Sequence, residues 1–147
     1  MAINPDYAGR TYPATAPYEV SRVKIAEFAD AIGDPGSVFR DAAAAQAAGH
    51  PDVIAPPTFA IVVSMVGAGS AMADPGLGLD YSMVVHGEQQ FTYTRPIMAG
   101  DVITAQATID SIRSVGSLSM MTTRTEIRTT AGEHVCTAVS TLVERGK

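Results

Sequence analysis

The chain has 147 residues, a length that suits one domain able to bury about two-thirds of the surface that its unfolded form exposes. Hydrophobic residues make up 46% of the chain and charged residues 17%, which predicts a globular protein with a sizeable core. The net charge is -5 and no cluster of Lys and Arg occurs. Nucleic-acid binding is therefore not expected, because phosphate contacts need clustered cations.

The single cysteine and the apolar segments bear on location. Cys136 excludes an internal disulfide, and we expect an ordinary buried thiol in a reducing cytoplasm. Residues 1–12 contain no basic region followed by an apolar stretch, so a secretory signal is not predicted. Residues 53–73 carry no charge and approach the length of a bilayer-spanning helix, but two prolines and two glycines interrupt them. Neither end has a Lys or Arg anchor, which favours a buried helix over membrane insertion.

Three helices are predicted in the first half of the chain. Ser21 can cap the first helix, whose apolar residues follow helical spacing until Gly33 ends it. Residues 41–48 form a second, short helix on propensity, closed by a glycine. Pro57 suits the first turn of a third helix that runs to Gly67. The third helix is apolar nearly all round, so we expect it to be buried.

Strands are predicted in the second half, and one short strand is expected before the first helix. The alternation of apolar and polar residues is clearest in the second long strand, which indicates one buried and one exposed face. The predicted long strands are residues 84–93, 102–112, 118–128 and 134–143. We find no internal repeat and no low-complexity linker, so residues 1–147 are expected to form a single domain.

The order of these elements predicts an α+β fold. An antiparallel sheet must cover its apolar face, and the helix predicted to begin at Pro57 is the only element apolar enough to do so. A curved antiparallel sheet wrapped around one central apolar helix is the hot-dog fold. We therefore predict a single hot-dog domain.

Two stretches resemble the MaoC-like hydratase and dehydratase family of hot-dog proteins: residues 18–59, which include IAPPTF, and residues 86–103, which include RPIMAGD. The likeness is closest to the N-terminal-type half of the family. That half occurs fused to a catalytic hot-dog domain in two-domain hydratases, and as a separate subunit in the mycobacterial (3R)-hydroxyacyl carrier-protein dehydratases of mycolic acid synthesis. The resemblance implies a fatty acyl thioester of coenzyme A or acyl carrier protein as ligand. It also implies pairing with a second hot-dog domain, in a homodimer or with a catalytic subunit.

In catalytic members of this family, an Asp is followed by Asn-Pro and by a His five residues after the Asp, and His-Gly stands at the head of the central helix. Here Asp34 matches the acidic residue, whereas Phe39 falls on the histidine and Pro57 on the glycine. Phenylalanine cannot exchange a proton, and proline has no backbone N–H to offer the substrate carbonyl. The resemblance thus implies that no catalytic dyad is intact and that Asp34 is a remnant. The residues it places along the substrate are Phe39, Pro57, Thr58, Phe59 and His86.

Several of these residues also have plainer interpretations. Asp34 before Pro35-Gly36 is typical of an ordinary turn, because Asp accepts local backbone hydrogen bonds. Phe39 is typical of core packing or of an acyl-tunnel wall, and His86 of a surface or interface residue. The three histidines lack metal-ligand spacing, so we expect neither a metal nor another cofactor.

Four functions are compatible with this sequence. The first is a non-catalytic subunit that holds the acyl chain and completes a dehydratase with a separate catalytic hot-dog subunit. The second is a self-sufficient homodimeric enoyl-thioester hydratase that uses Asp34 with His86 or a water. The third, a hot-dog thioesterase, is disfavoured because residues 53–73 lack the Asp or Glu that many such enzymes place on the central helix. The fourth is a binding or regulatory homodimer without turnover.

Overall fold

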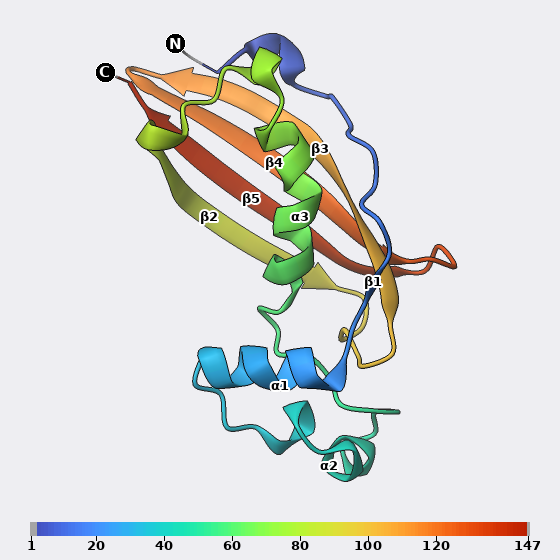
Figure 1. Cartoon of the computed structure of the whole chain (residues 1–147). Coiled ribbons are helices and arrows are strands. Elements are labelled where there is room, and N and C mark those ends of the chain that lie inside the picture. The colour runs from blue at the N-terminus through green and yellow to red at the C-terminus, as the bar shows by residue number, and fades with distance from the viewer. Residues whose placement is uncertain (1–2, 147) are drawn as a thin grey trace.

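The computed structural model describes residues 3–146, whose strands form one antiparallel sheet that curves over a central helix (Figure 1). The strand order across the sheet is β1-β3-β4-β5-β2. The strands are β1 (Tyr18–Glu19), β2 (Val84–Tyr93), β3 (Val102–Val115), β4 (Leu118–Thr129) and β5 (His134–Arg145). The short first strand and the four long strands confirm the prediction, although β3, β4 and β5 each extend slightly beyond the predicted end.

Alternation of side chains along β3 gives the sheet one buried face, as predicted. Ile103, Ala105, Ala107 and Ile109 are fully buried, and the intervening residues are polar. Because successive side chains of a strand point to opposite faces, this pattern turns an apolar surface toward the helix and a polar surface away from it. The resulting architecture is the predicted α+β arrangement.

Two short helices follow β1 and lie beyond the end where the central helix begins (Figure 1). They are α1 (Arg22–Ala31) and α2 (Ala42–Ala47). The Ser21 side chain accepts a hydrogen bond from the backbone N–H of Lys24 and so caps α1, as predicted. Gly33 has a φ of 73°, a left-handed conformation that ends the helical segment at little steric cost.

The central helix α3 spans Ala60–Met72, so both of its predicted ends were wrong. At the start, Pro57 lies in a turn in which the N–H of Phe59 bonds the carbonyl of Pro56 at 2.9 Å, and regular helix follows that turn. At the other end, Gly67 lies inside the helix. A Cβ at Gly67 would stand 2.9 Å from that of Ala105, so this glycine permits close packing of α3 on β3.

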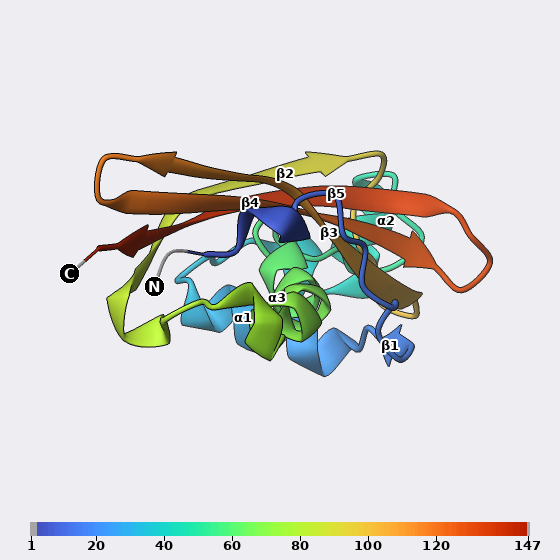
Figure 2. The ribbon, with the colours of Figure 1, turned by 90° about the horizontal axis from the view of Figure 1, so that it is seen from above.

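The expectation that α3 is buried all round was wrong as well. The helix packs chiefly on β3 and β4, and the sheet covers one side of it (Figure 2). Met65 and Val66 face away from the core, with exposed fractions of 46% and 64%. Within residues 3–146, no helix has the length and apolar character needed to cross a membrane.

Buried side chains form two clusters, one near each end of α3. The cluster near the start includes Ile25, Phe59 and Ile97, and the Phe28 ring packs edge-on against the Phe59 ring at 5.3 Å between centroids. The cluster near the end consists of Ile3, Tyr12, Ala71, Leu77, Ile109 and Met121. The first cluster borders the candidate site.

Candidate functional site

The main candidate site is a cavity of about 430 Å³ near the start of α3. Its volume lies in the range typical of small-molecule sites. The walls come from the 3-10 turn Ser37–Phe39, the segment that precedes α3, and the end of β2 with the residues after it. The lining residues are Val38, Phe39, Ile54, Ala55, Pro57, Tyr93, Thr94, Arg95 and Pro96. No carboxylate, imidazole or thiol occurs among these residues, so the cavity favours an apolar ligand.

Phe39 lies in this cavity wall because of the tight turn before it. Its backbone N–H bonds the carbonyl of Gly36 at 3.3 Å, and its side chain is only 9% exposed. A Cβ at Gly36 would stand 2.8 Å from the Phe39 ring, so the glycine leaves room for the ring against the turn. The Phe39 side chain is thus held as an apolar wall of the cavity.

Asp34 does not line the cavity. Its carboxylate accepts the backbone N–H of Gly36 at 2.9 Å, which is the local hydrogen bond of an Asp-initiated turn. The residue is partly buried and shapes the turn that carries Phe39. Its observed contact is the one that the plainer turn interpretation expects.

The Tyr93 side chain contacts the backbone at the start of α3. Its hydroxyl donates to the carbonyl of Pro57 at 2.5 Å and accepts a backbone hydrogen bond from Ala60. Burial raises the pKa of Tyr93 above its ordinary value, and the neighbouring Cys136 adds to the shift. Burial likewise raises the pKa of the Cys136 thiol to about 11. At neutral pH both groups are therefore protonated and neutral.

The cation in the cavity wall is already paired. The Arg95 guanidinium donates to both carboxylate oxygens of Asp101 at 2.9 and 3.0 Å and to Glu133 at 2.6 Å. Hydrogen bonds to Asp101, followed by those to Glu133, raise the pKa of Arg95 despite partial burial. Because two carboxylates pair with its charge, Arg95 stabilises the rim of the cavity and does not offer an unpaired charge to a ligand.

The structure brings Phe39 and Pro57 to one cavity but does not bring the other three predicted substrate residues there. Thr58 is exposed in the turn before α3, and Phe59 is fully buried in the core. His86 lies on β2, where its Nε2 is 3.0 Å from the carbonyl of Glu88 and 3.3 Å from the Ser140 hydroxyl. None of the three lines the cavity.

Sequence reasoning missed Tyr93 and Arg95 as cavity residues. The alternation in β2 could have placed Tyr93 on the same face as Phe91, because both lie two residues apart in one strand. The contact of its hydroxyl with Pro57 depends on how the segment before α3 crosses the strand end. No local pattern encodes that crossing.

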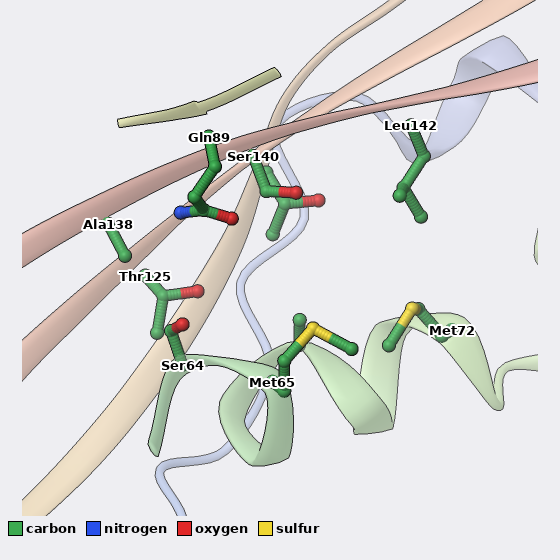
Figure 3. Close-up of a pocket in the computed structure, with 10 residues that line it drawn as sticks. Ser64, Met65, Met72, Gln89, Thr125, Ala138, Ser140 and Leu142 are labelled. Atoms are coloured by element: carbon green, nitrogen blue, oxygen red, sulfur yellow. The ribbon is translucent and has the colours of Figure 1, made fainter. Parts of the chain in front are cut away.

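A much smaller recess lies farther along α3, between this helix and the sheet (Figure 3). Its volume is about 30 Å³, room for one water-sized group. Side chains of α3, β2, β4 and β5 face each other across it. The Gln89 Oε1 atom is buried there without a hydrogen-bond partner within residues 3–146. The lining residues are Ser64, Met65, Ala68, Met72, Gln89, Thr123, Thr125, Ala138, Ser140 and Leu142.

No metal site was found in the described part of the chain. Residues 3–146 contain no group of three or more His, Cys, Asp or Glu side chains arranged to hold a metal ion.

Residues 7–138 match the family model described as the FAS1-like, dehydratase domain region. A UPF0336 protein of Thermobifida fusca is 60% identical over 146 residues, which are 99% of this chain and 96% of the relative.

Solved structures show the same fold. A structure described as a MaoC-like dehydratase superposes with a TM-score of 0.87 at 31% identity, covering 95% of this chain and 42% of that chain. This chain therefore spans less than half of that larger protein. The HadBC (3R-hydroxyacyl-ACP dehydratase) complex of Mycobacterium tuberculosis superposes with a TM-score of 0.79 at 28% identity, covering 94% of this chain and 97% of that chain. The likeness confirms the predicted hot-dog fold.

Proposed function

We propose that this chain, which belongs to the FAS1-like dehydratase family and is a MaoC-like hot-dog protein, is the substrate-holding subunit of a two-component dehydratase. It binds the acyl part of a (3R)-hydroxyacyl or 2-enoyl thioester, carried by coenzyme A or acyl carrier protein, in fatty or mycolic acid metabolism. A separate catalytic hot-dog subunit supplies the reacting groups. The observation that carries the proposal is the apolar cavity that contains both Phe39 and Pro57.

The chemistry of hydration explains why this cavity suits holding rather than turnover. Addition or removal of water needs a group that exchanges protons near neutral pH, which is typically worth about a hundred to ten thousand fold in rate. Phe39 cannot supply it, and the buried, hydrogen-bonded hydroxyl of Tyr93 has a raised pKa. None of the other lining residues has an acid or base that titrates near neutrality.

The thioester oxygen also needs hydrogen-bond donors, because it gains charge as the proton on the neighbouring carbon moves. Loss of one such donor costs on the order of 3 to 4 kcal/mol in other enzymes. Pro57 has no N–H, and Tyr93 accepts the backbone hydrogen bond from Ala60 at the first residue of α3. Neither Pro57 nor Ala60 thus offers a free N–H at this helix start.

A partner subunit is supported by the free edge of the sheet. β2 pairs only with β5 in the described chain, so one side of its ten residues carries unpaired backbone groups. The apolar side chains of Val85 on β2 and of Met65 and Val66 on α3 are exposed. The similar HadBC structure is itself that of a complex.

Reconstitution tests the proposal. The purified chain alone should not hydrate 2-enoyl thioesters, and addition of a catalytic hot-dog subunit with an intact Asp and His pair should give a complex with a higher rate than that subunit alone. Absence of both complex and rate gain would refute the proposal. Ile54→Glu, which places a charge in the cavity wall, should abolish the gain while the complex still forms. Val23→Glu, at a residue that is 71% exposed, is the matched control and should change neither.

The same experiment separates the alternatives. A self-sufficient hydratase requires that the pure protein turns over 2-enoyl thioesters and that Asp34→Asn abolishes this turnover. We expect instead that Asp34→Asn leaves the rate gain with the catalytic subunit unchanged, because Asn can accept the same turn hydrogen bond. A thioesterase would release free thiol from the thioester. A regulatory homodimer would bind acyl thioesters in calorimetry without any rate effect on a catalytic partner.

A further inference from the structure

The cavity and the recess are related through one row of side chains on β2. Tyr93 lines the cavity and Gln89 lines the recess. Because side chains alternate along a strand, Gln89, Phe91 and Tyr93 point to the same face of β2. Four residues of strand span about 13 Å, so the two spaces lie within one row of side chains beside α3.

Phe91 stands between the two spaces in this row. It is paired across the sheet with Ala138, which lines the recess, and its ring centroid lies 6.5 Å from that of Tyr93. Figure 3 shows Gln89 and Ala138 on the face that is turned toward α3. Tyr93 is tethered by its bond to Pro57, whereas the Phe91 side chain can form no hydrogen bond.

We propose that the aromatic pair Phe91 and Tyr93 closes the inner end of the acyl cavity and limits its ligands to medium-chain acyl thioesters. The inference rests on the proposed acyl-binding function. The recess behind the pair has room for one water-sized group, which is too little for a continuing alkyl chain. Tyr93 is the fixed member of the pair, and Phe91 is the member whose size decides whether the cavity extends toward Gln89.

Calorimetry with octanoyl-CoA and hexadecanoyl-CoA, below the micelle concentration of each, tests this limit. The wild-type chain should bind octanoyl-CoA more tightly. Phe91→Ala should shift the ratio of the two affinities toward hexadecanoyl-CoA by on the order of tenfold, because about two more methylenes would then be buried. Thr92→Ala, at an exposed residue on the opposite face of β2, is the control and should leave the ratio unchanged.

Circular dichroism and thermal melting check that each variant folds. If Phe91→Ala does not fold, Phe91→Val gives a smaller opening at a partly exposed residue and should produce a smaller shift in the same direction. Wild-type binding of both ligands with equal affinity, or an unchanged ratio in a folded Phe91 variant, would overturn the limit and leave the acyl-binding function standing. Binding of neither ligand by the wild-type chain, alone or with a catalytic subunit, would overturn both proposals.

Discussion

The cavity beside Phe39 and the recess beside Gln89 lie along the same helix, yet they differ in volume by more than tenfold, at about 430 and 30 Å³. The cavity is walled by the turn Ser37–Phe39 and the segment before α3, which lie outside the helix-sheet contact. The recess lies where α3 packs directly on the sheet, next to the close contact at Gly67. The larger space in this domain is therefore formed by the segments that precede the central helix together with the end of β2 and the residues after it.

The largest effect is expected where core packing supports the cavity. Phe59→Ala removes a fully buried ring that packs on Phe28, so the free energy of unfolding should fall by about 3 to 5 kcal/mol. Urea unfolding followed by circular dichroism measures it. Val66→Ala on the exposed side of α3 is the control and should change stability by no more than about 0.5 kcal/mol. Equal effects would show that the start of α3 is not a packed support for the cavity.

The contact beside the recess can be tested with two glycines of one helix. Gly67→Ala and Gly69→Ala gain the same helix propensity, but only a Cβ at Gly67 would meet Ala105 and Thr125, at 2.9 and 3.0 Å. We therefore expect Gly67→Ala to be less stable than Gly69→Ala by about 1 to 3 kcal/mol in urea unfolding. A Gly67→Ala variant as stable as Gly69→Ala would contradict direct packing of α3 on β3.

A smaller effect on stability is expected from removal of the Tyr93 hydroxyl, which bonds the backbone before α3. Tyr93→Phe removes the hydrogen bond to the Pro57 carbonyl and should lower the free energy of unfolding by about 1 kcal/mol. Enoyl hydration by the pure chain should remain absent, because the variant creates neither a proton carrier nor an N–H at Pro57. Hydration by Tyr93→Phe alone would show that the phenol masks a competent site.

The smallest effect at neutral pH comes from the buried thiol. The pKa of Cys136 is raised from 9.0 to about 11 by burial, so the unfolded chain loses this proton first as pH rises. The contribution of Cys136 to stability is fully present below about pH 9 and is lost as pH rises toward about 11. Thermal melts across this range should show a weaker alkaline loss for Cys136→Ala than for the wild type. Identical slopes would contradict burial of the thiol.

Local patterns predicted most of the fold and only part of the site. Ser21 and Gly33 mark the two ends of α1 through their own side-chain and backbone chemistry. The buried face of β3 could likewise be predicted from the alternation of apolar and polar residues alone. The predicted end of α3 at Gly67 was wrong, because a glycine that ends a helix cannot be told from sequence from one that allows close packing on a strand. Phe39 and Pro57 were expected at one site on resemblance, and they do line one cavity. Tyr93 was missed because its role depends on a contact across 36 residues.

The tether between Tyr93 and Pro57 joins two parts of the chain that lie 36 residues apart. The Tyr93 hydroxyl contacts both the Pro57 carbonyl and the backbone N–H of Ala60, so a displacement of the end of β2 would also displace the start of α3. Phe39 and Pro57 line the same cavity, and such a displacement would change its shape. The cavity is therefore mechanically coupled to an edge strand of the sheet.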